Sequence, residues 1–271
     1  MRDAGRDLFR ARVEDALEKS RKGSLAVISF LTPRERKAAE RILREYGSWE
    51  QAWLWGGYDG AERACLFLLP DYLLSAFPGE TLPSENAQVL ELLGEDAVRA
   101  VCAVRIKGSG YRTLTHRDYL GSILGLGLER DALGDIAVQN DFEAVVFCPA
   151  VLASFLLEGL TKVASDTVHC EPYTPDASFT DGRKYRAISD TVASERLDCV
   201  VAALTNLSRE HAQQAIRSGL VELDFEGEER VDVLLEPPVS ISVRGYGRYI
   251  LRSFDGETRK GRLRMRADQL I

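Results

Sequence analysis

The sequence predicts an α+β protein built from several small domains. At 271 residues the chain has room for about two domains of ordinary size, or three small ones. Its hydrophobic and charged contents, 45% and 28%, are those of globular proteins and exclude a wholly disordered chain. Segments with helical periodicity alternate with short apolar segments typical of strands, which favours a mixed fold along the whole chain.

The composition also excludes several classes of protein. No run of about 18 apolar residues occurs, so no membrane span is predicted, and the charged start of the chain predicts no signal core. The five cysteines are scattered without a C-x-x-C pair, which favours reduced thiols in the cytoplasm over a disulfide scaffold or a thiolate zinc site. The net charge of −7 excludes a surface that is basic throughout, but it is compatible with a local basic patch.

We expect a small N-terminal α/β domain over residues 1–80. Its clearest signal is a helix start at Thr32, where Pro33 occupies the first helical position and Glu35 completes a capping box. A glycine-rich turn over residues 56–60 separates two apolar segments that are typical of paired strands. The predicted elements are a helix over Leu8–Arg21, a strand over Leu25–Phe30, a helix over Pro33–Arg44, and strands over Gln51–Trp55 and Ala64–Leu69.

Residues 90–173 are predicted to form a second domain with its own order of elements. These are a strand over Val98–Ile106, a helix over His116–Leu126 capped by Thr115, strands over Ile136–Val138 and Ala144–Phe147, a helix over Val151–Val163, and a strand over Thr167–Glu171. The order β-α-β-β-α-β is the split pattern of ferredoxin-like domains, which include the RNA-recognition fold. We therefore expect a ferredoxin-like, RNA-binding middle domain, in which Phe142 and Phe147 belong to the core.

The last part of the chain is predicted as a third domain over residues 187–255, followed by a basic tail over residues 256–271. A linker rich in Asp, Thr, Pro and Gly, residues 172–186, precedes it. Leu197, Val200, Val201 and Leu204 form the buried stripe of a first helix, and Ser208 caps a second that ends at Gly219. Strands are expected over Leu220–Leu223, Val231–Leu235 and Val239–Val243.

From Ser194 the chain reads S-E-R-L-D-C-V-V-A-A-L, then S-R-E-H-A-Q-Q-A-I-R-S-G-L-V-E-L, and after a hairpin V-S-I-S-V-R-G-Y-G-R. Over these roughly 50 residues the sequence resembles the S4 RNA-binding domain. Two departures lie in the hairpin region: Leu223-Asp224-Phe225 stands where the family has Val-Asn-Gly, and Pro237-Pro238 where it has Gly-Asp.

The charges of this domain predict an RNA-binding face. Arg196 and Arg209 each fall in the first turn of a helix, where free N–H groups and the dipole favour a phosphate that arginine can grip bidentately. Seven acids lie between Glu222 and Glu236, whereas eight basic residues lie between Arg244 and Arg266, and Tyr246 and Tyr249 are placed to stack on a base. The residues expected to contact RNA are Arg196, Asp198, Ser208, Arg209, Gln213, Arg217, Arg244, Tyr246 and Arg248, with His116 and Arg117 in the middle domain.

Three further blocks extend the resemblance to most of the chain. Phe30-Leu31-Thr32-Pro33, the run Gly56-Gly57-Tyr58-Asp59-Gly60-Ala61-Glu62-Arg63, and the segment from Leu114 to Ile136 with its H-R-D-Y-L-G-S-I-L-G-L-G-L-E-R core resemble the YlmH family. That resemblance implies a non-enzymatic factor, similar to the small S4-domain protein RqcP. It implies binding to rRNA and tRNA on large ribosomal subunits that retain stalled peptidyl-tRNA, in ribosome-associated quality control. It also implies a link to cell division and possible protein partners in either process.

Two alternatives from other classes remain open at this point. Arg196-Leu197-Asp198 imitates the Gly-Arg-Leu-Asp signature of pseudouridine synthases, which allows an RNA-modifying enzyme that uses the S4 domain as a handle. Trp49, Trp53 and Trp55 allow a division scaffold with an aromatic contact face, or they are core residues. We predict no catalytic residue, no cofactor and no metal site, since His116, His169 and His211 are dispersed without ligand spacing.

Overall fold

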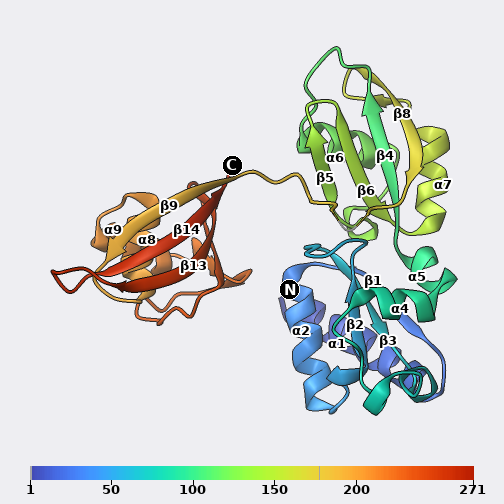
Figure 1. The fold of residues 1–271 in the computed structure, drawn as a ribbon, viewed down its shortest axis with the longest axis horizontal. Helices are drawn as coiled ribbons and strands as arrows, with labels where there is room; N and C mark the ends of the chain where they lie inside the picture. The colour runs from blue at the N-terminus through green and yellow to red at the C-terminus, as the bar shows by residue number, and fades with distance from the viewer. Residues whose placement is uncertain (1, 177) are drawn as a thin grey trace. The chain divides into compact units, whose positions relative to one another are not determined.

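The protein is described by a computed structural model that covers residues 2–176 and 178–271 (Figure 1). The chain divides into two compact units, residues 1–182 and 183–271. The first unit contains a three-stranded and a five-stranded sheet, and the second contains a six-stranded sheet. Helices accompany antiparallel strands in both units, so the predicted mixed α and β class is confirmed. Among the helices described, none is both long enough and apolar enough to cross a membrane.

The N-terminal part of the first unit is a sheet with strand order β1-β3-β2, packed against α1 and α2. Helix α2 begins at Pro33 because the Thr32 hydroxyl accepts the Glu35 N–H while the Glu35 carboxylate accepts the Thr32 N–H. The elements are α1 (Arg2–Arg21), β1 (Ala26–Leu31), α2 (Pro33–Glu45), a 3-10 turn η1 (Trp49–Gln51), β2 (Ala52–Trp55) and β3 (Ala64–Leu68).

Short helices lead from this sheet to the next one. They are α3 (Asp71–Leu74), the 3-10 turn η2 (Pro78–Glu80), α4 (Asn86–Leu93) and α5 (Glu95–Ala100). The strand expected from Val98 is therefore wrong in its first residues, which belong to α5. A continuous apolar run does not distinguish the end of a helix from a buried strand, and here Val98 is exposed while Ala97 and Val101 are buried.

The second sheet of this unit has the strand order β5-β6-β4-β8-β7. Its main elements follow one another as β-α-β-β-α-β, and the buried residues of α6 and α7 pack on one face of the sheet. The elements are β4 (Cys102–Gly108), α6 (His116–Gly125), η3 (Arg130–Ala132), β5 (Ile136–Asn140), β6 (Glu143–Cys148), α7 (Ala150–Gly159), β7 (Lys162–Val163) and β8 (Asp166–Tyr173).

The two sheets of the first unit share one hydrophobic core. Phe30 and Phe67 from the first sheet belong to the same buried cluster as Val145 and Phe147 from the second. Gly57 lies against Phe147 with φ of +103°, and a Cβ atom there would stand 2.2 Å from the ring. Only glycine fits both the left-handed backbone and this approach.

A buried carboxylate also connects the two sheets of the first unit; we call this contact region the joint. Asp135 accepts hydrogen bonds from the Tyr58 hydroxyl (2.7 Å) and from the backbone N–H groups of Glu62 (2.7 Å) and Arg63 (3.1 Å). The guanidinium of Arg63 donates to the carbonyls of Leu133 (2.8 Å) and Phe30 (3.1 Å). The sequence blocks around Phe30, Tyr58 and Asp135, which are far apart along the chain, therefore meet in this joint.

The second unit is a six-stranded sheet in the order β11-β10-β12-β13-β14-β9. Helices α8 and α9 lie on one face, where they share a core with the inward side chains of β12, β13 and β14 (Figure 1). The elements are β9 (Tyr185–Val192), α8 (Leu197–Thr205), α9 (Arg209–Arg217), β10 (Val221–Leu223), β11 (Glu226–Gly227), β12 (Val239–Val243), β13 (Gly247–Glu257) and β14 (Leu263–Leu270).

Three sequence expectations for this end of the chain are corrected. The basic segment expected as a tail contains β14, which pairs with both β13 and β9. The segment expected as a linker contributes the first residues of β9, and its Phe179 packs against Tyr58 and Phe147 of the first unit. The strand expected over Val231–Leu235 is an irregular segment with one isolated bridge, from Leu234 to Arg196.

Candidate nucleic-acid interface

A buried carboxylate joins the two helices of the second unit. Asp198, in the first turn of α8, is fully buried and accepts hydrogen bonds from three side chains. Arg196 donates through Nε (3.1 Å) and Nη2 (3.2 Å), Arg209 at the start of α9 through Nε (3.0 Å), and Gln213 one turn later through Nε2 (2.6 Å). We call these four residues the Asp198 cluster; all four were predicted from the sequence as site residues.

The Asp198 cluster presents positive charge to solvent. The side chains of Arg196 and Arg209 are 32% and 54% exposed, and two guanidinium groups against one carboxylate leave a net charge of about +1. Within the part of the chain that the structure describes, no acceptor is hydrogen-bonded to either Nη atom of Arg209. A guanidinium held through Nε with its outer N–H groups available is arranged to bind a phosphate oxygen.

The start of α8 has no N–H group of Leu197 or Asp198 to offer to an anion. The N–H groups of Leu197 and Asp198 donate to the carbonyls of Val233 (2.8 Å) and Val231 (3.1 Å), so they are unavailable to an anion. The prediction of free N–H groups at this helix start is therefore wrong. Asp198 itself is too deeply buried to touch RNA, and its role is to position the two arginines.

The hydrogen bonds also fix the charge of Asp198. Burial by itself raises the pKa of this carboxyl, but the hydrogen bonds from Arg196, Gln213 and Arg209 outweigh burial. Together they hold the pKa of Asp198 well below its usual range. The carboxylate is therefore ionised throughout the physiological range, and the two guanidinium groups stay clamped.

Asp198→Asn is expected to destabilise the second unit by about 2 kcal/mol at pH 7, because an amide N–H₂ would face N–H donors. A carboxyl group whose pKa is lower in the folded than in the unfolded protein stabilises the fold fully at pH values above the unfolded pKa, which is about 4 for Asp. The stabilisation is lost as the pH falls below that value toward the pKa of the folded state. The difference between wild type and variant should thus be constant from pH 5 to 8 and shrink below about pH 4. Amide hydrogen exchange of α8 and α9 measures it, and equal exchange at pH 7 would contradict the positioning role.

The other predicted residues of this unit do not take part in the hydrogen bonds of the cluster given above. Ser208 caps α9 by accepting the His211 N–H (3.2 Å), and Arg217 is exposed in the last turn. Arg244 and Tyr246 are exposed at the turn between β12 and β13. Tyr249 is only 2% exposed, with its hydroxyl donating to the Tyr246 carbonyl, so its expected stacking on a base is wrong.

The hairpin where the sequence departs from the S4 pattern keeps a tight turn. Leu223 pairs with Glu226, and the two residues between them, Asp224 and Phe225, have φ values of +45° and +70°. These are the left-handed conformations that Asn-Gly adopts in type I′ turns. The guanidinium of Arg248 lies 5.0 Å from the centre of the Phe225 ring, an aromatic contact that sequence reasoning missed because the family usually has glycine there.

The middle part of the first unit holds His116 and Arg117, which lie in the first turn of α6 and are exposed. The structure places them in a different unit from the Asp198 cluster. Thr115 caps this helix, and the Asp118 carboxylate accepts hydrogen bonds from the Thr115 hydroxyl (2.7 Å) and the Thr115 N–H (2.8 Å), which together lower the pKa of Asp118. An anion bound at the start of α6 would therefore be held by the His116 and Arg117 side chains more than by the backbone N–H groups of the helix end.

On the exposed face of the second sheet, basic side chains are paired with acidic ones. Arg105 on the central strand β4 pairs with Glu143 (3.1 Å) and Glu171 (3.5 Å), and Lys107 pairs with Glu171 (2.7 Å). The Arg105 guanidinium also lies 3.9 Å from the Tyr173 ring centre. Two cations and two anions leave this part of the face with no net attraction for phosphate.

The aromatic residues of the first unit are divided between core and surface. Phe147 is fully buried as expected, but Phe142 is 38% exposed, so its assignment to the core is wrong. Trp53 is buried, stacks on Trp55 and donates its indole N–H to Asn86 (2.8 Å), which gives it a role in packing. Trp49 lies beside the Arg44 guanidinium.

Among solved structures, the Cell division protein ylmH from Streptococcus pneumoniae is similar with a TM-score of 0.47 and 19% identity, over 64% of this chain and 92% of that chain. Residues 101–176 match the family described as "Putative RNA-binding domain in YlmH". Over 261 residues, 94% of this chain and 93% of the relative, the sequence is 28% identical to the Ribosome-associated protein quality control protein P2 of Bacillus subtilis. The family match and this relative confirm the predicted resemblance of the chain to the YlmH family.

Proposed function

We propose that the chain is a non-enzymatic RNA-binding factor of ribosome-associated quality control. The observation that carries this proposal is the Asp198 cluster, in which one buried carboxylate holds two partly exposed guanidinium groups ready for phosphate. The RNA-binding domain matched at residues 101–176 and the ribosome-associated relative in Bacillus subtilis support the same class of ligand. In this proposal the protein acts in the cytoplasm, on large ribosomal subunits that retain peptidyl-tRNA.

The two parts that bind RNA have distinct folds in this proposal. The strand order β5-β6-β4-β8 and the β-α-β-β-α-β sequence of elements support a ferredoxin-like middle domain. The helix pair α8 and α9 followed by β10 and β12 supports an S4 domain, which β9 and β14 extend on the other side of β13. The S4 domain supplies Arg196 and Arg209, and the middle domain supplies His116 and Arg117.

Geometry argues against the enzymatic alternative. A pseudouridine-synthase-like reaction would need the Asp198 carboxylate to reach the substrate. Here the side chain is fully buried, and the Arg196 and Arg209 guanidinium groups and the Gln213 amide are bonded to it. Both carboxylate oxygens are thus occupied by donors that would have to leave before any chemistry.

In the middle domain we expect RNA to meet the start of α6 and not the compensated sheet face. Arg117→Gln should lower the slope of log K against log salt by about one unit, because one phosphate contact is lost. Lys107→Gln removes the same charge from a residue already paired with Glu171, and it should leave the slope unchanged. Fluorescence anisotropy with a labelled RNA stem-loop measures both; equal slopes for the two variants would contradict the assignment.

Ultraviolet crosslinking in cells, followed by sequencing of the RNA bound to the full chain, tests the proposed function. We expect crosslinked reads to be concentrated in large-subunit rRNA and in tRNA. The crosslinked peptides should include the start of α9, where Arg209 is exposed. Reads distributed over messenger RNA in proportion to its abundance would contradict a ribosomal role.

A further inference from the structure

The outer face of the sheet in the second unit carries a row of arginines on β14. Arg264 and Arg266 stand on either side of the buried Met265 in β14 and lie opposite Thr191 and Ser189 of β9. Because side chains alternate between the two faces of a strand, both arginines point to the face opposite Met265. Arg262, just before the strand, lies on the same side and donates its Nε to the Thr191 hydroxyl (3.0 Å). Alternate residues of a strand are about 6.7 Å apart, so these arginines form a regular row.

This row lies on the side of the sheet opposite the helices. The inward residues of β13 and β14, among them Leu251, Met265 and Ala267, share a core with α8 and α9. Side chains of a strand alternate between faces, which puts the arginines of β14 on the other surface. The Asp198 cluster is formed at the starts of the two helices, so the row is a separate surface of the same unit.

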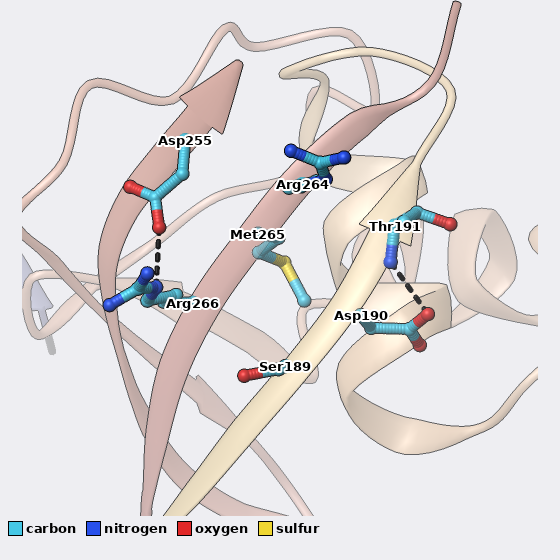
Figure 2. Close-up of a pocket in the computed structure, with 7 residues that line it drawn as sticks. All are labelled: Ser189, Asp190, Thr191, Asp255, Arg264, Met265 and Arg266. Carbon is cyan, nitrogen blue, oxygen red and sulfur yellow. Dashed lines mark hydrogen bonds and ion pairs between the residues drawn. The ribbon is translucent and has the colours of Figure 1, made fainter. Parts of the chain in front are cut away.

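Figure 2 shows the residues that line a hollow along β9 and the turn end of the β13–β14 hairpin. The volume of this hollow is about 460 Å³. Arg266 turns toward Asp255 and forms an ion pair with it, while Arg264 points away from both (Figure 2). The hydroxyl-bearing residues Ser189 and Thr191 line the same hollow. The lining also includes Met265 and a second carboxylate, Asp190, so its two arginines and two carboxylates balance in charge.

The tip of the β13–β14 hairpin adds positive charge beyond the hollow. Its tip is a tight turn in which Gly261 donates to the Thr258 carbonyl, and this turn presents Arg259 and Lys260 to solvent. Residues 252–266 contain six basic and two acidic side chains, a net charge of +4 in a chain whose total is −7. Over the described residues, Arg259, Lys260 and Arg264 form no ion pair with an acidic side chain. This charge is thus available to an anionic ligand.

We propose that the outer face of β14 and the hairpin tip form a second RNA-binding surface, which grips the phosphate backbone of an RNA segment different from the one at the Asp198 cluster. Charge complementarity identifies the occupant: a regular row of arginines on an extended strand matches the repeating charge of a nucleic-acid backbone. The inference rests on the proposed function and adds to it that the second unit contacts RNA from both sides of its sheet.

The test uses the full chain and a fluorescein-labelled RNA stem-loop, with anisotropy measured between about 50 and 200 mM salt. In the hairpin variant Arg259→Gln/Lys260→Gln/Arg264→Gln, the slope of log K against log salt should fall by about three units. The matched control, Arg12→Gln/Lys19→Gln/Arg34→Gln, removes three exposed charges from the first unit and should change it by less than one unit. Lys260→Gln alone, at the exposed turn, should lower the slope by about one unit without any risk to folding.

The outcomes separate this inference from the proposed function. If Arg196→Ala/Arg209→Ala weakens binding while the hairpin variant keeps the wild-type slope, the second surface is refuted and the Asp198 cluster stands. A control that loses as much slope as the hairpin variant would also refute it, since only net charge would matter. Wild-type protein that fails to bind the stem-loop contradicts both. Losses that add when the two sets are combined would support two independent surfaces.

Discussion

Replacing Arg196 and Arg209 together with alanine is expected to weaken RNA binding by the full chain about 100-fold. Each guanidinium is bonded to Asp198 on one side and exposed on the other, so each offers a charge-assisted hydrogen bond to a phosphate. A hydrogen bond of this kind contributes about 1.5 kcal/mol, which is roughly tenfold in affinity. The slope of log K against log salt should fall by about two units, one for each lost phosphate contact.

Two further variants control for charge and for position. Arg196→Lys/Arg209→Lys keeps both charges but loses the fork that binds Asp198 and phosphate together, so we expect it to recover the salt slope but only part of the affinity. Arg217→Ala removes a charge from the far end of α9 and should cost less than either cluster arginine. Wild-type affinity and slope in the double alanine variant would show that RNA binds elsewhere.

Asp135→Ala is expected to destabilise the first unit by about 4 kcal/mol, because it removes the one acceptor shared by Tyr58, Glu62 and Arg63. Three donors would lose this buried acceptor, and the loss of one partner of a buried charged network is costly. All three tryptophans lie in the first unit, so the urea dependence of tryptophan fluorescence in the full chain reports on this unit alone.

The control for this prediction is Asp131→Ala. Its side chain is 93% exposed and lies 3.7 Å from Arg63, so the free energy of unfolding should change by less than about 0.5 kcal/mol. Equal unfolding midpoints for Asp135→Ala and wild type would mean that the two sheets of the first unit do not depend on this joint.

Local signals in the sequence predict much of the fold. The capping box of Thr32 and Glu35 and the cap at Thr115 both start helices at the predicted residue, because these interactions involve only neighbours along the chain. Alternation of apolar residues likewise predicts the strand over Val239–Val243.

The features that the sequence did not predict depend on pairing between strands that are far apart along the chain. The segment with β14 is rich in arginine and has the composition of a solvated tail, yet its Met265 and Ala267 are buried between β13 and β9. Pairing with two neighbouring strands, which the composition of the segment does not reveal, makes it part of the sheet. Val98 lies just before the apolar residues of β4 in the sequence and yet belongs to helix α5.

In the candidate site, too, local sequence signals and long-range contacts contribute different information. Sequence pattern identifies Arg196, Asp198, Arg209 and Gln213, but it does not reveal that Asp198 is the buried centre to which the other three are bonded. It also assigns the anion to the N–H groups of α8, which Val231 and Val233 occupy from a segment some 30 residues away. The sequence pattern points to these four residues, whereas their hydrogen-bond partners are known only from the fold.

Sedimentation of tagged full-length protein from a cell lysate on a sucrose gradient tests the central claim most directly. Wild type should travel with the large ribosomal subunit at low salt, and Arg196→Ala/Arg209→Ala should remain at the top of the gradient. If both proteins stay at the top, the chain does not associate with ribosomes and the proposed function fails. If both travel with the subunit, association does not depend on the Asp198 cluster, and its assignment as the RNA-binding site is contradicted.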